Sequence, residues 1–414
     1  MKVYKKITVV GLLMIALTYG IARFGFGLLI PSISKDLNIS STAVGLISSS
    51  SYLAYCIAIV LSSIYTSRIG SKKFLTLSGL AAVMGMLLIT TSSNSFMLAI
   101  GVFLAGSSTG FASPSLGSIV NLNLREDEKN KSNTWINAGT GFGILISGPL
   151  SFLMGDNWRN IYVIFIIVGI VIFISNLIFI PKSQSHVENT KNYKIISIFK
   201  LGLKIIISSF ILGFCSSIYW TFSKAYIDQF NTNNESILFW MIVGISGIIG
   251  GFSSSIEEKI GIRKTYLIVV IMISLAILLI TVQPSNIILI DISAFIFGSS
   301  YILLTGIYIL WGIKIFPKEH SIGIGLPFLV LAIGQLVGSS VSGLSIDLIG
   351  YKFSFIFFSI LSLSSLFFKP PNKRWGWDII PSQKKNRLGK IIFYLIDSFY
   401  ILFQKNKALA YNNE

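Results

Sequence analysis

The sequence predicts an all-α membrane protein with twelve transmembrane helices in two pseudo-symmetric six-helix bundles. Three observations lead to this fold class: a scarcity of charge, regularly spaced apolar runs, and a loop pattern shared by the two halves. Charged residues are 12% and hydrophobic residues 53% of the 414-residue chain, whereas an ordinary soluble domain is about 25% charged. Soluble domains of this total length would need more polar residues to cover their surfaces.

The apolar runs have the length of membrane spans, which need about 20 mostly apolar residues. Twelve runs meet this criterion, near 7–31, 42–65, 74–92, 95–122, 134–155, 160–180, 203–226, 237–256, 266–283, 286–316, 322–345 and 351–368. A polar interval separates the sixth run from the seventh. We therefore expect an N-terminal bundle (1–180), a cytoplasmic linker (181–202), a C-terminal bundle (203–368) and a basic cytoplasmic tail (369–414).

The distribution of positive charge predicts the orientation. If the N-terminus is cytoplasmic, the inside segments up to residue 368 hold 19 Lys and Arg residues and the outside loops hold three, Lys35, Arg159 and Lys352. This bias follows the positive-inside rule and predicts a multi-pass cell-membrane protein, expected to be a monomer, with both termini cytoplasmic. The net charge of +17 lies in short clusters between apolar runs, which argues against a nucleic-acid partner.

The tail contains a second apolar stretch, from Ile391 to Phe403, which Asp397 interrupts and basic residues flank. The stretch is too short to span a bilayer. We expect it to form an interfacial helix on the anionic cytoplasmic leaflet of the lipid bilayer, and the alternative is a disordered basic tail.

A short pattern recurs in the two halves. Arg68-Ile69-Gly70-Ser71-Lys72-Lys73 follows the second run, and Lys259-Ile260-Gly261-Ile262-Arg263-Lys264 follows the eighth, 191 residues later (68 to 259). Gly-Ser-Ser also occurs in both the fourth and the tenth run, at 106–108 and 298–300. Internal repeats of this kind are typical of transporters.

With these features the chain resembles the major facilitator superfamily, specifically its prokaryotic, efflux-like members with twelve helices. The family's loop pattern is Gly-x-x-x-Asp-Arg-x-Gly-Arg-basic. Arg68, Gly70 and Lys72 match it, whereas its Gly, Asp and second Arg are replaced by Ser63, Ser67 and Ser71. Because the family's Asp helps to latch the cytoplasmic side, the resemblance implies that the first half lacks this latch. The second-half copy retains an acid, Glu258, before Lys259.

The fifth run contains Gly143-Ile144-Leu145-Ile146-Ser147-Gly148-Pro149, which is similar to a Gly-Pro motif of proton-coupled exporters. Pro149 removes a backbone donor and bends a helix, and Gly148 permits close packing at the hinge. The alternative interpretation is a generic kinked helix.

Away from the span ends, three charged residues lie within apolar runs: Arg23, Lys224 and Asp291. A charge at the bilayer centre costs roughly 2.5–3.5 kcal/mol on insertion scales, so Arg23 must face other helices or a wet cavity. It has three candidate partners: a substrate anion, Asp291 or backbone carbonyls. Lys224 is interpreted as an anchor that reaches the outer interface.

The resemblance implies that spans one, four, seven and ten line a central cavity, and all three charges fall on that set. Helical spacing and the positions of polar and aromatic residues predict its lining, with five and eleven as contributing spans. The candidates are Tyr19, Arg23, Phe26, Asn137, Tyr219, Trp220, Asp291, Tyr301, Thr305 and Gln335. Arg23 and Asp291 are also the candidates for coupling to a proton or another ion. Candidates for conformational loops and the hinge are Arg68, Gly70, Lys72, Gly148, Pro149, Glu258, Lys259, Gly261, Arg263 and Lys264.

No pattern of catalytic, metal-binding or nucleotide-binding residues occurs, so we expect neither an enzyme nor a cofactor or metal. The sequence predicts a secondary transporter that moves a small organic molecule by alternating access, with proton-coupled export favoured. Two alternatives stay open. One is uptake or exchange of a small organic anion bound by Arg23, and the other is a transporter-like sensor or scaffold that moves nothing.

Overall fold

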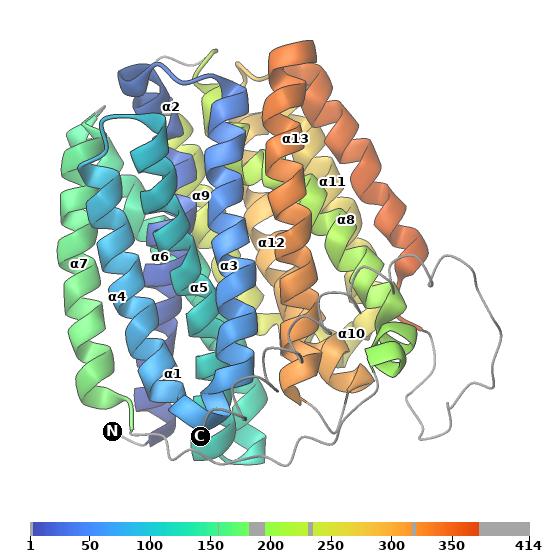
Figure 1. The fold of residues 1–414 in the computed structure, drawn as a ribbon. Coiled ribbons are helices and arrows are strands. Elements are labelled where there is room, and N and C mark those ends of the chain that lie inside the picture. The colour runs from blue at the N-terminus through green and yellow to red at the C-terminus, as the bar shows by residue number, and fades with distance from the viewer. Residues whose placement is uncertain (1–2, 156, 182–194, 231–234, 317–319, 372–414) are drawn as a thin grey trace, which may run out of the picture. The chain divides into compact units, whose positions relative to one another are not determined.

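The computed structural model describes residues 3–155, 157–181, 195–230, 235–316 and 320–371, and Figure 1 shows their arrangement. The first half consists of α1 (Val3–Ile15), the π-helix η1 (Ala16–Phe24), α2 (Gly25–Leu37), α3 (Ser41–Ile69), α4 (Ser71–Thr90), α5 (Ser95–Asn123), α6 (Glu126–Met154) and α7 (Trp158–Phe179). The expected interfacial helix and most of the expected linker lie outside the described residues.

The second half repeats this plan. It consists of α8 (Ile195–Ile227), α9 (Glu235–Gly247), the 3₁₀ helix η2 (Ile248–Phe252), α10 (Ser253–Ile260), α11 (Ile262–Val282), α12 (Ile287–Ile315), α13 (His320–Ser362) and the 3₁₀ helix η3 (Leu363–Phe368). Eleven continuous helical stretches in the described part of the chain can cross a membrane. The last bends at Gly350, where φ is 79°, so its two arms match the runs predicted at 322–345 and 351–368. The twelve-helix fold class is confirmed.

Polar residues placed just before the apolar runs begin several helices. The side chain of Asn94 accepts a hydrogen bond from the Met97 amide at 2.9 Å, and Asn286 accepts one from the Ile288 amide at 3.1 Å. Ser40 caps α3 in the same way. These side chains satisfy amide groups that have no partner within the first helical turn, so local sequence determines where the spans start.

The repeated loop has the same backbone geometry in both halves. Gly70 joins α3 to α4 with φ of 96°, and Gly261 joins α10 to α11 with φ of 84°. L-residues rarely adopt these angles, so glycine is required in each tight connection. The pattern found in the sequence is therefore a structural repeat.

Lys72, a basic residue of the first loop pattern, stabilises a neighbouring helix. Lys72 Nζ donates hydrogen bonds to the carbonyls of Leu177 at 2.9 Å and Ile180 at 2.6 Å, and it thereby caps the end of α7. In the second half, Glu257 forms an ion pair with Lys314 at 2.5 Å, which joins α10 to α12, whereas the neighbouring Glu258 is exposed.

The first transmembrane segment contains a π-helix where the sequence predicts continuous α-helical spacing. All nine residues of η1 are buried, and Arg23 lies in its last turn. A Cβ on Gly20 would lie 2.5 Å from the Cα of Gly143, so η1 and α6 touch through their backbones. π-helical turns frequently occur at functional sites. The α-helical spacing used to predict the cavity lining therefore does not hold over residues 16–24, because a π-helix has more residues per turn than an α-helix.

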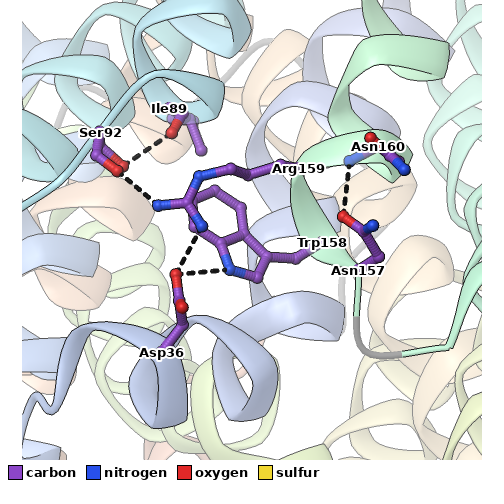
Figure 2. Close-up of polar contacts among 7 residues, drawn as sticks. All are labelled: Asp36, Ile89, Ser92, Asn157, Trp158, Arg159 and Asn160. Atoms are coloured by element: carbon purple, nitrogen blue, oxygen red, sulfur yellow. Dashed lines mark hydrogen bonds and ion pairs between the residues drawn. The ribbon is translucent and has the colours of Figure 1, made fainter.

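At the end of the molecule opposite the chain's start, Asp36 and Arg159 together connect three helix ends (Figure 2). Asp36, in α2, accepts hydrogen bonds from Arg159 Nη1 at 2.5 Å and Trp158 Nε1 at 3.3 Å. Arg159 Nη2 donates to the Ser92 carbonyl at 2.9 Å, and the guanidinium lies 4.1 Å from the Trp158 ring centroid. The cluster holds the ends of α2, α4 and α7 together.

Arg159→Ala is expected to lower the midpoint of thermal unfolding of the detergent-purified protein by a few degrees at most. The effect is small because the ion pair is partly exposed, and exposed pairs contribute little. Lys35→Ala is the matched control, since Lys35 is an exposed cation one residue before Asp36. Equal midpoints for Arg159→Ala and Lys35→Ala would show that the cluster does not stabilise the fold.

Candidate functional site

Arg23 lies between the two halves of the chain, with its side chain among groups from both. Its Nη1 donates to Thr109 Oγ1 at 3.4 Å, and its Nη2 donates to Gln335 Oε1 at 3.1 Å. The guanidinium carbon is 4.5 Å from the ring centroid of Tyr52 and 4.8 Å from that of Tyr55. Aromatic faces attract cations. No acidic side chain forms an ion pair with Arg23 in the part of the chain that the structure describes.

A small cavity borders Arg23, and further hydrogen bonds connect its walls. Gln335 Nε2 donates to the Tyr301 hydroxyl at 2.9 Å. Asn137 Nδ2 donates to Thr305 Oγ1 at 2.9 Å, which joins α6 to α12. The lining of the cavity comprises Tyr19, Arg23, Phe24, Tyr55, Asn137, Thr140, Tyr301, Thr305, Phe328, Leu331, Ala332 and Gln335. We call this the amide cavity, after Asn137 and Gln335.

A second cavity also borders Arg23 and Phe24. Its lining comprises Arg23, Phe24, Phe26, Gly27, Ile30, Ser48, Ser51, Tyr52, Val102, Trp220 and Thr221. We call this the serine cavity. Gly27 and Ile30 follow Arg23 along α2 towards the α2–α3 connection, so this cavity extends from Arg23 in that direction. Phe24 stacks on Trp220 with ring centroids 4.1 Å apart, and this contact joins the two halves beside Arg23.

Each cavity is much smaller than an organic substrate. Each cavity has a volume of about 20 Å³. One buried water molecule needs about 10–15 Å³ on the same scale. Entry of an organic molecule therefore requires the helices around the cavities to separate.

Hydrogen bonds between α3 and α13 close the end of the molecule that carries the α2–α3 connection (Figure 1). The amide and hydroxyl of Thr42 donate to Asp347 Oδ2 at 2.8 and 2.6 Å. About two turns further along α3, the Ser49 and Ser340 hydroxyls are 2.6 Å apart. A Cβ on Gly45 would lie 2.5 Å from the Ser339 carbonyl oxygen, so the two backbones are in close contact at this position.

The structure brings together most of the predicted lining residues but not all of them. Tyr19, Arg23, Asn137, Tyr301, Thr305 and Gln335 line the amide cavity, and Phe26 and Trp220 line the serine cavity. Tyr219 lies outside both cavities, stacked on Phe297 with ring centroids 3.7 Å apart and its hydroxyl 2.8 Å from that of Ser293.

Asp291 is also placed away from Arg23. It precedes Tyr301 by ten residues, which is roughly 15 Å along the α12 axis at 1.5 Å per residue, and it lines neither cavity. Of the three partners considered for Arg23, the described residues thus bring neither Asp291 nor a backbone carbonyl to its guanidinium. Lys224, interpreted from sequence as an interfacial anchor, is instead buried and paired with Asp228 at 2.8 Å.

Sequence reasoning missed the residues of the second and fourth spans that surround Arg23. Tyr52, Tyr55 and Thr109 contact it, and Ser48 and Ser51 line the serine cavity. One signal was available, because residues 48–51 are four consecutive serines within an otherwise apolar run.

The Gly-Pro segment lies in α6, which is continuous from Glu126 to Met154 with Pro149 inside it. A Cβ on Gly148 would lie 2.1 Å from the Met241 side chain of α9. The glycine thus permits close packing across the two halves, and the role of this segment as a hinge stays a prediction. The Arg68 side chain lies outside the described residues.

Two six-helix bundles that meet around a polar, membrane-embedded cavity define a secondary transporter fold. The sequence model of the Major Facilitator Superfamily matches residues 12–325, and the chain belongs to this superfamily of transporters.

Comparisons with individual proteins agree with this family. The human voltage-gated purine nucleotide uniporter SLC17A9 is 28% identical over 148 residues, and the rat protein is 24% identical over 140 residues. The human match covers 34% of this chain and 34% of the relative, so the chain matches about a third of the length of these curated relatives.

Solved structures of two transporters share the fold across most of the chain. A variant of the nucleoside transporter NupG has a TM-score of 0.70 at 13% identity and covers 88% of this chain and 98% of its own. The human organic anion transporter MFSD10 (TETRAN) has a TM-score of 0.68 at 13% identity, with 88% and 99% covered. The family and these proteins are transporters, which is consistent with the expectation that the chain is not an enzyme.

Proposed function

We propose that this protein carries a small organic anion across the membrane by alternating access, in uptake or exchange, and that Arg23 binds the negative group. The observation that carries the proposal is the environment of Arg23. The residue is 8% exposed, and neither cavity beside it has an Asp or Glu among its lining residues.

The electrostatics of Arg23 support an anionic ligand. Burying a charge costs several kcal/mol even after the protein relaxes. Aromatic rings and the oxygens of Thr109 and Gln335 offset part of that cost. A carboxylate supplies the missing opposite charge and can accept two parallel hydrogen bonds from a guanidinium. The site is therefore arranged for an anion that arrives from outside the protein.

The similar proteins also support this substrate class. The human, rat and mouse relatives are named as purine nucleotide uniporters, and MFSD10 is named as an organic anion transporter. Nucleotides are organic anions, so these names support the anionic class and not the number of charges, and NupG is named as a nucleoside transporter.

Alternating access accounts for the closed state of the site. The α3–α13 hydrogen bonds close one end, and neither cavity holds a substrate at its present size. If the N-terminal end is cytoplasmic, as the loop charges predict, the closed end is the extracellular one. Substrate exchange then requires α3 and α13 to separate on the outside or the bundles to separate on the inside.

Proton-coupled export is the second candidate, and the Gly-Pro segment around Pro149 favours it. A proton-coupled carrier needs a group in the transport path that gains and loses a proton. Asp291, the sequence candidate for this role, lies outside both cavities. We therefore place anion uptake or exchange ahead of export.

Counterflow into proteoliposomes that contain the purified full-length protein tests the proposal. The panel contains an aromatic monocarboxylate, an aliphatic monocarboxylate, a nucleoside monophosphate, a neutral nucleoside and an organic cation. We expect counterflow above protein-free liposomes for one or more anions and for neither the nucleoside nor the cation. Movement of only the neutral or cationic compounds would support export instead. Background values throughout would support the non-transporting scaffold.

A further inference from the structure

The serine cavity contains buried polar groups without hydrogen-bond partners. Among the described residues, Arg23 Nε, Ser48 Oγ, Ser51 Oγ and Trp220 Nε1 are buried without a hydrogen-bond partner, and all four residues line this cavity. Arg23 is 8% exposed, and Ser48 and Ser51 are each 5% exposed. Folded proteins pair the great majority of such groups, so four unpaired groups around one small space indicate a ligand that forms hydrogen bonds with them.

The unpaired groups define the chemistry of that ligand. Arg23 Nε and Trp220 Nε1 can only donate a hydrogen bond, and each serine hydroxyl can donate one. Tyr52 and Thr221 add two more hydroxyl groups to the wall, and no carboxylate lines it. The cavity measures about 20 Å³, which suits a head of one or two oxygen atoms and not a whole organic molecule. A carboxylate has these properties.

The amide cavity suits a different part of the same molecule. Apart from Arg23, its lining residues are uncharged. Two hydrogen-bonded pairs are already present, Asn137 with Thr305 and Gln335 with Tyr301. Such groups can exchange these bonds for bonds to a neutral polar substituent. Because Arg23 is the single charged residue lining either cavity, one negative charge neutralises the site. A second would remain buried without compensation, which is costly.

We infer that the serine cavity binds the carboxylate head of the substrate and the amide cavity binds its neutral, hydrogen-bonding body, so that the substrates are organic monocarboxylates. This inference rests on the proposed function, because it assumes that the site takes an anion. It adds the position of the head group, the residues that recognise it and the preference for a single negative charge.

Binding of three pyridine compounds to the purified full-length protein tests the inference. Nicotinate is a monocarboxylate with a ring nitrogen that can accept a hydrogen bond, nicotinamide is its neutral isostere, and quinolinate is the dianion. We expect nicotinate to bind at least about tenfold more tightly than the other two, because hydrogen bonds to a charged group are stronger than those to a neutral one; tenfold corresponds to about 1.4 kcal/mol.

The serine variants test the position of the head group. Ser48→Ala and Ser51→Ala are each expected to weaken nicotinate binding about tenfold and to leave nicotinamide binding unchanged. The matched control is Ser78→Ala, which removes a buried, unpaired hydroxyl on α4 that lines neither cavity. Thermal unfolding without ligand supplies a second readout. Ser48→Ala and Ser51→Ala should each raise the midpoint, because each removes a buried group that has no partner.

The outcomes separate the inference from the proposed function. If the protein transports anions but nicotinate fails to bind, quinolinate binds more tightly, or the serine variants bind nicotinate like the wild type, the subsite assignment is wrong and the anion proposal stands. If neither nicotinate nor quinolinate binds and the counterflow panel shows no anion transport, both are wrong.

Discussion

Arg23→Gln is expected to reduce anion counterflow by on the order of 100- to 1,000-fold. Leaving one member of a buried ion pair without its partner costs about 3–5 kcal/mol, and each 1.4 kcal/mol is about a factor of ten in binding. Arg23 is the charged residue that borders both cavities, and glutamine retains hydrogen-bonding capacity without charge. The loss of counterflow should therefore be confined to anionic compounds.

Three further measurements make this result specific. Arg23→Lys keeps the charge but loses the planar pair of donors, so we expect it to be intermediate. Arg159→Gln removes a cation that lines neither cavity and should retain counterflow. Without ligand, Arg23→Gln should raise the thermal midpoint, because it removes a buried charge that has no acidic partner. Wild-type anion counterflow by folded Arg23→Gln protein would refute the role of Arg23.

Gly45→Leu is expected to reduce transport strongly by opposing closure of the α3–α13 end. A Cβ at Gly45 would lie 2.5 Å from the Ser339 carbonyl oxygen and 3.2 Å from Gly343 Cα, so a leucine fits only if the helices separate. Overpacking of this kind costs about 1–3 kcal/mol, which corresponds to a shift of about 5- to 150-fold in a conformational equilibrium. The variant should therefore populate a state that is open at this end.

Thiol labelling can detect that state directly. In a background with Cys56→Ala and Cys215→Ala, a Ser48→Cys probe in the serine cavity should react faster with a membrane-impermeant reagent when Gly45→Leu is present. Gly117→Leu is the matched control, because a Cβ at that helical glycine has no atom of the described residues within 4 Å, apart from its chain neighbours and its own helix backbone. Unchanged labelling together with retained transport would show that the glycine contact does not control closure.

Most of the fold was predictable because its signals are local. Each span is a continuous apolar run, the caps at Asn94 and Asn286 stand directly before their helices, and Gly70 and Gly261 mark equivalent turns. The π-helix at Ala16–Phe24 was not predictable in this way. Its sequence contains no local mark that distinguishes it from an α-helix, and its backbone contact with α6 involves a residue more than a hundred positions away.

The candidate site was predictable in part. Arg23 had to face the protein interior because lipid excludes a charge. Helical spacing placed Tyr301 and Thr305 on a polar face, and Gln335 was a polar residue in the eleventh span. Asp291 shares a span with Tyr301 but lies several turns from the cavity. Tyr52, Tyr55 and Thr109 contact Arg23 from spans that carry no charge in their cores, so a search for buried charge could not reveal them.

By itself, the sequence determined that this is a membrane protein of twelve spans in two related halves, with a buried cation in the first. These properties follow from the free energy of placing each segment in lipid, and that energy depends on the segment's own residues. Only the tertiary structure decided that Arg23 meets Thr109, Gln335 and aromatic rings and does not meet Asp291. Such partners depend on how helices rotate and pack against one another, and this packing is a property of the whole assembly of helices.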